Sequence, residues 1–291
     1  MMLKFLNNIG KTGLSVIKLF FFTKWFGLLN HRTNKKTCLI LGNGPTLLTS
    51  IEKYKKLGTK LDLFCVNNFA CTSQYEDLKP EFYILQAPQF FLDDDKLSTF
   101  YIEQRRTLFN HIQTKTNWDI FLVIPVKAKK STAFNQLLAS NEHLKPLYFN
   151  DTAIEGFSFI KRFCFNNSLG MPRPHNVLIP SLMNAINIGF KEIYIVGADH
   201  SWLGEIAVND KNEALVHQKH FYDETSSKPE KMQDYIHRPR RLHEIINKFY
   251  LTFLGYWEIK EYSEKKGVHV INASETSMID AFERRSLESL K

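Results

Sequence analysis

Short apolar runs alternate with amphipathic segments along most of the chain. Seven runs have the length of buried strands, at 37–41, 61–66, 82–85, 120–124, 147–149, 192–196 and 268–271. Helical spacing of apolar residues is clearest at 46–56, 177–189, 237–266 and 276–290, with Gly255 expected to break the third of these helices. This alternation predicts an α/β fold with a modified Rossmann-like, mainly parallel sheet.

The first residues follow a different pattern. Apolar and aromatic residues dominate Leu3–Leu29, whereas Lys4, Lys11 and Lys18 recur every seven residues and therefore share one helical face. Lys18 and Lys24 interrupt the apolar run, so no uncharged stretch reaches the roughly 18 residues of a spanning helix. We expect an amphipathic helix that lies on a membrane surface. Packing on the body or on a partner subunit, and a true span, are the alternatives.

Charge is concentrated in the same segment. The chain has a net charge of +8, and residues 1–36 hold seven basic residues and no acidic one. The remaining 255 residues carry 31 basic and 30 acidic residues, so the body has no excess charge with which to attract nucleic acid. We therefore expect a basic membrane-associating segment at 1–36 and one domain at 37–291. The protein would be cytoplasmic and peripheral on the inner membrane.

The cysteines and acidic residues do not indicate a metal site. Cys38, Cys65, Cys71 and Cys164 form no C-x-x-C pair, which predicts free thiols in a reducing compartment. The run Asp93–Asp95 is typical of a solvated charge cluster. No metal and no cofactor is expected.

Polar residues follow the predicted strands where each strand ends. Ligands bind outside the carboxyl ends of the strands in a parallel sheet. The candidate ligand-binding residues at these ends are Gly42, Asn43, Gly44, Pro45, Thr46, Asn67, Asn68, Gln86, Asp199 and His200.

The turn after the first strand has the pattern of a phosphate-binding loop. Two glycines, Gly42 and Gly44, precede a helix whose N-terminus would supply free N–H groups. The third glycine of a dinucleotide fingerprint is replaced by Leu47, and the acid expected after the second strand is replaced by Asn67. The pattern disfavours NAD and favours another nucleotide-bearing ligand.

Histidines cluster in the second half of the chain. Six of the ten lie within residues 175–243, and a polar stretch at about 204–243 has the character of a lid-like insertion. Histidine titrates near neutrality, which suits a base that removes a hydroxyl proton. The candidates are His237 and His220. Neighbouring cations that could stabilise a leaving group are Arg238, Arg240 and Arg241.

Four motifs carry a resemblance to a known family. They are Leu41–Leu47 (LGNGPTL), Cys65–Phe69 (CVNNF), Glu81–Tyr83 with Phe90 and Phe91, and Gly189–Asp199 (GFKEIYIVGAD). In this order they resemble the bacterial family 42 sialyltransferases. The wider group includes proteins related to the archaeal 6-hydroxymethylpterin diphosphokinase and to flagellin glycosyltransferases. The resemblance implies a GT-A-like variant of the Rossmann fold.

The resemblance also implies roles for single residues. Asn43 would lie near the donor phosphate, and Asn67 would contact the CMP-sugar. Gln86 stands where the family has a third asparagine, and Asn176 stands where it has a serine. Trp202 replaces the first of two phosphate-binding tyrosines, so Tyr222 or Tyr235 would substitute. His237, two residues after Tyr235, or His220 would be the base.

The residues and the resemblance together imply an inverting, metal-independent glycosyltransferase whose domain at 37–291 is nucleotide-sugar-binding. It would transfer sialic acid or a related nonulosonate from a CMP-sugar to a surface glycan or a lipid-linked acceptor. A pterin diphosphokinase-like enzyme that uses ATP and a non-catalytic, membrane-bound nucleotide-sugar-binding protein stay open as alternatives, as does a homo-oligomer.

Overall fold

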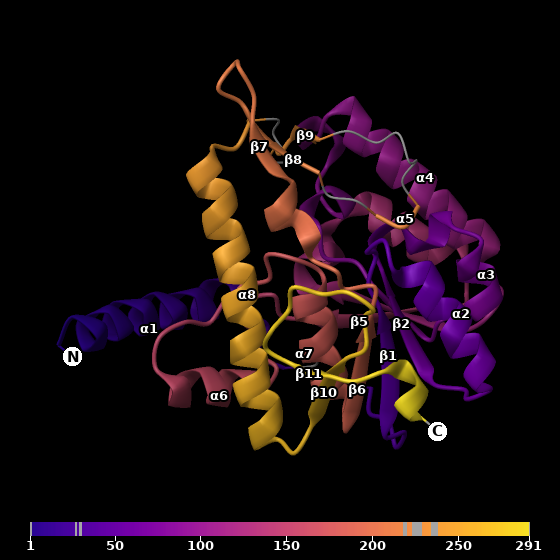
Figure 1. Ribbon diagram of the computed structural model, residues 1–291, viewed down its shortest axis with the longest axis horizontal. Coiled ribbons are helices and arrows are strands. Elements are labelled where there is room, and N and C mark those ends of the chain that lie inside the picture. The colour runs from indigo at the N-terminus through magenta and orange to yellow at the C-terminus, as the bar shows by residue number, and fades with distance from the viewer. Residues whose placement is uncertain are drawn as a thin grey trace.

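An eight-stranded sheet runs through the centre of the protein (Figure 1). The computed structural model describes residues 2–26, 28, 31–217, 220–222, 229–233 and 238–290. The strands of the sheet are β1 Thr37–Leu41, β2 Asp62–Val66, β3 Phe82–Ile84, β4 Ile120–Pro125, β5 Leu144–Phe149, β6 Glu192–Val196, β10 His269–Asn272 and β11 Glu283–Arg284. All seven pairings between them are parallel, which confirms the predicted α/β class.

The strand order places a topological switch point beside β1. The order across the sheet is β11-β10-β6-β1-β2-β3-β4-β5, so the chain builds outward from β1 to β5 and then returns to β6 on the other side of β1. Leu39 of β1 consequently lies between Leu63 and Tyr194. Ligand sites in open α/β sheets form at such a point.

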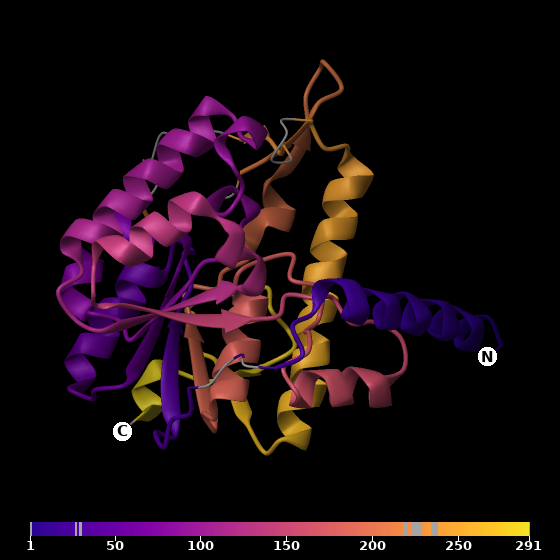
Figure 2. The ribbon, with the colours of Figure 1, turned by 180° about the vertical axis from the view of Figure 1, so that it is seen from behind.

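Helices cover both faces of this sheet (Figures 1 and 2). On one face lie α2 Leu47–Leu57, α3 Gln74–Leu78, α4 Thr99–Lys115 and α5 Thr132–Ser140, and on the other lie α6 Ser158–Asn166, α7 Leu178–Ile188 and α8 Leu242–Lys265. Alternate residues of β1 enter the two resulting cores: Cys38 and Ile40 enter one, and Leu39 and Leu41 enter the other. This burial on both sides explains why the strands appear as uninterrupted apolar runs.

Two predicted helical features are wrong. The segment 276–290 forms β11 and a 3₁₀ turn at Leu287–Leu290 instead of a helix. Gly255 does not break α8: it lies against Ile179 of α7, and a Cβ at this position would be 2.9 Å from Cδ1 of that isoleucine. Gly255 allows α7 and α8 to approach closely. The sequence around the glycine predicts a helix break instead, because it contains no information about the neighbouring helix.

A small second sheet lies in the segment predicted to resemble a lid. It consists of β7 Ile206–Val208, β8 Ala214–Val216 and β9 Glu230–Lys231, paired antiparallel. Its apolar residues pack with Trp202 and with Ile245 and Phe249 of α8. The start of α8 therefore has its own small core beside the main sheet.

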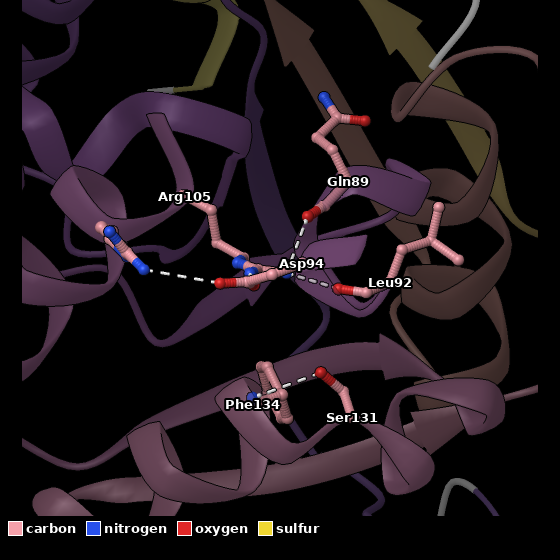
Figure 3. Close-up of polar contacts among 7 residues, drawn as sticks. Gln89, Leu92, Asp94, Arg105, Ser131 and Phe134 are labelled. Atoms are coloured by element: carbon pink, nitrogen blue, oxygen red, sulfur yellow. Dashed lines mark hydrogen bonds and ion pairs between the residues drawn. The ribbon is translucent and has the colours of Figure 1, made fainter. Parts of the chain in front are cut away.

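Arg105 of α4 anchors the loop that follows β3 (Figure 3). The side chain is 2% exposed, donates to the carbonyl oxygens of Gln89 and Leu92, and pairs with Asp94. Asp94 also pairs with Arg106, so the acidic run predicted to be solvated is partly neutralised by α4. The anchored loop forms one wall of the main cleft.

Helix α1 Met2–Phe22 packs on the body through a mainly polar side, from which Leu19 enters the core on the α7 face of the sheet. Ser15 is fully buried and bonds to the backbone of Glu155, Thr12 Oγ1 accepts the N–H of Phe157, and Thr23 Oγ1 lies 2.7 Å from Thr152 Oγ1. The N-terminal half of the helix extends beyond the body (Figure 2).

The opposite side of this helix is apolar and exposed. Its exposed large apolar residues are Met2, Leu3, Phe5, Leu6, Ile9, Leu14, Val16, Ile17, Phe20, Phe21 and Phe22, followed by Trp25 and Phe26. Lys11 and Lys18 lie on the body side, where their charges act on Glu155. None of the helices in the described part of the chain is both long and apolar enough to cross a membrane.

We expect Gly156→Ala to release α1 from the body. Gly156 has a φ of 104°, and an added Cβ would overlap Thr12. Strain of about 1–2 kcal/mol in the docked state corresponds to roughly tenfold faster proteolysis within residues 2–22. Gly10→Ala, on the same helix with no atom within 4 Å of the added Cβ, is the control. Equal cleavage rates in the two variants would contradict this docking.

Candidate functional site

A cleft of about 880 Å³ lies at the carboxyl ends of β1, β2, β3 and β6. Of the predicted site residues it is lined by Gly42, Asn43, Gly44, Pro45, Asn67, Asn68, Gln86, Asn176, Asp199, His200, His220 and Tyr222. Thr46 is not one of the lining residues, and Tyr235 and His237 fall outside the described residues. The structure thus brings together residues from six separate chain segments at the switch point.

The glycine-containing turn after β1 contacts the end of β6. Gly42 N–H donates to Val196 O at 2.8 Å, and Gly44 N–H donates to Gly197 O at 2.7 Å. A Cβ at Gly42 would overlap Gly197. The two glycines of the turn are therefore required for the close crossing of two strand ends, whatever ligand the turn holds.

Asp199 is integrated into the same crossing. Its carboxylate accepts the N–H of Thr46 at 3.4 Å and the hydroxyl of Thr276 at 2.8 Å. A carboxylate consequently lies at the N-terminus of α2, where the phosphate-loop interpretation expects a free positive dipole. The phosphate-binding role of the turn stays a prediction, and most of its donors are already used within the protein.

Strand-end amides present unpaired acceptors to the cleft. Asn43 Oδ1, Asn68 Oδ1 and Gln86 Oε1 are buried, and none has a hydrogen-bond partner among the described residues. The nitrogens of two of these amides are bonded within the protein: that of Asn43 donates to Val66 O at 3.3 Å, and that of Gln86 donates to Asp151 Oδ2 at 3.3 Å. The three unpaired amide oxygens therefore fit a ligand that offers neutral N–H or O–H donors.

His200 is held by a buried polar cluster. Its Nε2 lies 2.6 Å from Tyr256 Oη and 3.1 Å from Asn176 Nδ2, and its ring stacks on Trp202 at 4.0 Å. Burial lowers the pKa of His200 to about 3, so the ring is neutral. The amide nitrogen of Asn176 can only donate, so its contact assigns Nε2 as the acceptor. Asn176 also caps α7, because its Oδ1 accepts the N–H of Leu178 and of Ile179. In this conformation both side chains orient each other.

His220 and Tyr222 are placed over the first turn. Phe221 N–H donates to Asn43 O at 3.0 Å. The ring of Phe221 packs beside the ring of Phe69, with the two ring centroids 6.0 Å apart. The rings of His220 and Tyr222 are parallel, with centroids 5.1 Å apart, and both line the cleft. A histidine and a tyrosine thus lie side by side at the cleft.

Basic groups line the α8 side of the cleft. Arg240 was anticipated as a cation near the site, but Lys248 was not. In the sequence, Lys248 is one of several lysines on a long amphipathic helix, and only its packing on the cleft distinguishes it. Burial first, and then the charge of Arg240, lower the pKa of Lys248 to about 8.

No protein-family model matches the chain, and no curated protein matches it in sequence. Within the part of the chain that the structure describes, no group of three or more His, Cys, Asp or Glu side chains could hold a metal ion. The chemistry of the site is therefore inferred from its own geometry and from the motifs in the sequence.

We expect acid to destabilise the protein between pH 6.5 and about 4. The pKa of His200 is lowered by burial to about 3, and that of His175 to about 4 by burial and by the charges of Arg173, Lys248 and Arg240, with Glu155 opposing. In the unfolded chain both are about 6.5. At these two histidines only the unfolded chain binds protons in this window. The free energy of unfolding therefore falls by about 1.4 kcal/mol per pH unit through His200 as the pH drops, and by less through the partly exposed His175.

Urea unfolding between pH 4.5 and 7 measures this slope. His200→Asn keeps a residue type that tolerates the φ of 53° at this position and should lower the slope by about 1.4 kcal/mol per pH unit. His269→Asn, at an exposed strand position, is the control. A slope that His200→Asn leaves unchanged would show that this histidine is not held neutral.

Proposed function

We propose that the protein is an inverting, metal-independent glycosyltransferase with a GT-A-like variant of the Rossmann fold. The donor would be a CMP-activated acidic sugar such as CMP-sialic acid, and the acceptor a surface glycan or a lipid-linked precursor. The observation that carries the proposal is the polar cleft at the β1–β6 switch point, whose buried amide oxygens await hydrogen-bond donors. Its volume of about 880 Å³ lies within the range of small-molecule sites.

The placement of polar groups supports a division of labour in the cleft. Asn43, Asn68 and Gln86 would bind the neutral part of the donor, because a nucleobase and a ribose both offer N–H or O–H groups to amide oxygens. The β7–β9 sheet and the segment around it would act as the lid. Asn176 and His200 would orient the sugar. They would contact it either with polar atoms that their mutual hydrogen bond and their bonds to Tyr256 leave accessible, or after exchanging one of these bonds for a bond to the sugar.

The transfer step needs one base and a stabilised leaving group. The acceptor oxygen would attack the anomeric carbon while the bond from that carbon to the phosphate oxygen breaks, and CMP would leave with the bonding electrons. His220, which lines the cleft, or His237 would take the acceptor's hydroxyl proton. Tyr222 and basic side chains would stabilise the charge on the departing phosphate without a metal ion.

The exposed apolar side of α1 supports a location at the membrane surface. A helix that contacts its own body through Thr12, Ser15 and Thr23 leaves its aromatic side available to the acyl-chain boundary. An acceptor tethered to lipid would then be found on the same surface as the enzyme.

We expect CMP to raise the melting temperature more than UDP, GDP or ATP does. A ligand that binds only the folded state stabilises it by mass action. The rate at which the protein hydrolyses CMP-sialic acid should then fall at least 100-fold in His220→Ala or in His237→Ala, depending on which histidine is the base. Stabilisation by ATP alone would favour a diphosphokinase-like enzyme. Donor binding without turnover in the wild type would favour a non-catalytic binding protein.

We also expect α1 to bind lipid. Sedimentation with vesicles of phosphatidylglycerol and phosphatidylethanolamine should recover the full chain but not a chain that lacks residues 2–36, since the aromatic side and most of the excess charge are removed together. Equal recovery of both chains would refute this location. Phe20→Ser combined with Phe21→Ser removes apolar area only and tests the contribution of the aromatic side.

A further inference from the structure

We propose that Lys248, Arg240 and His175 form an anion-binding subsite on the α8 side of the cleft, which takes a carboxylate or phosphate group of the substrate. The inference deepens the proposed function, on which its choice of substrate class rests. The three side chains come from separate segments: the loop before α7, the loop before α8, and α8 itself. All three line the cleft, and the charges of Lys248 and Arg240 both reach the ring of His175.

The subsite is distinguished by positive charge that no carboxylate in the described ranges neutralises. Neither Lys248 nor Arg240 forms an ion pair with a carboxylate among the described residues. Two other lysines that line the cleft are paired: Lys127 with Asp151 at 2.6 Å, and Lys231 with Glu213 at 2.5 Å. The unpaired cations are therefore a local property of this end of the cleft.

Two buried nitrogen atoms at the same place also lack hydrogen-bond partners in the described parts of the chain: the Nε–H donor of Arg240, and Nε2 of His175, which donates in the tautomer that carries its proton there. Taking a cation and polar atoms out of water without partners costs free energy. An anionic group would supply the missing acceptors and the missing charge together, because each of its oxygens accepts two or more hydrogen bonds.

The rest of the cleft would not serve a negative group equally well. At the first turn, the N–H groups of Gly42, Gly44 and Thr46 are donated within the protein, and the Asp199 carboxylate would repel a second anion. The amide oxygens of the strand ends are acceptors only. The cleft is thus divided into an end for neutral donors and an end for negative charge, which fits a ligand with a polar base or sugar and a separate acidic group.

The experiment compares Lys248→Met and Arg240→Met with the wild type and with Lys265→Met. Methionine keeps an unbranched apolar stem without the charge, and Lys265 is an exposed lysine of the same helix as Lys248. Melting temperatures are measured at constant ionic strength with inorganic phosphate, N-acetylneuraminic acid, CMP and cytidine. The wild type and Lys265→Met should be stabilised by at least one anion and bind it at least tenfold more tightly than the two cleft variants do.

The unliganded variants provide a second readout. Lys248 is a half-buried cation that no described carboxylate pairs with, so its loss should raise the melting temperature of Lys248→Met above that of Lys265→Met. A lysine that only supports the fold would lower the melting temperature on removal. A phosphate effect identifies the nucleotide phosphate as the occupant, and an effect of N-acetylneuraminic acid alone identifies the sugar carboxylate. Cytidine binding should be the same in all four proteins.

The outcomes for the subsite and for the proposed function are distinguishable. Anion binding that is equal in Lys248→Met and Lys265→Met overturns the subsite, even where CMP binds and the donor panel succeeds. Anion binding that depends on Lys248 while CMP and CMP-sialic acid fail to bind upholds the subsite and overturns the donor.

Discussion

The close crossing of two backbone segments at the β1–β6 junction is the constraint on which the site depends. Gly42 and Gly44 lie against Gly197 and Asp199 with no room for a Cβ between them. This contact brings the polar residues after β1 into the same space as those after β6. The orientation of His200, and through it of Asn176 and Tyr256, follows from the left-handed turn that continues the crossing.

The crossing also determines where charge is tolerated. Asp199 supplies a negative group at the start of α2, where it stabilises the helix terminus and the turn together. Positive groups gather instead on the α8 side, where a small core of Trp202, Ile245 and Phe249 supports them. The two ends of the cleft therefore differ in electrostatic character because two different structural units build them.

The sequence predicted the features that depend on local pattern. Strands β1, β2, β4 and β6 are apolar runs because both faces of the sheet are covered, and such runs are visible without a structure. Features that depend on distant neighbours were missed or misjudged. Gly255 was taken for a break because only the partner helix reveals the close approach. Lys248 has no sequence signal, since its burial arises from packing that several segments create.

The docking of α1 limits how the molecule can meet a surface. Thr12 and Ser15 of α1, and Thr23 directly after the helix, contact the body, so α1 cannot pivot as a flexible tether would. Any surface that receives the aromatic side of α1 must receive the whole molecule in one orientation. The mouth of the cleft then lies at a constant height and tilt above that surface. Only an acceptor long enough to extend from the surface to the cleft could react, so the length of the acceptor would determine which acceptors are used.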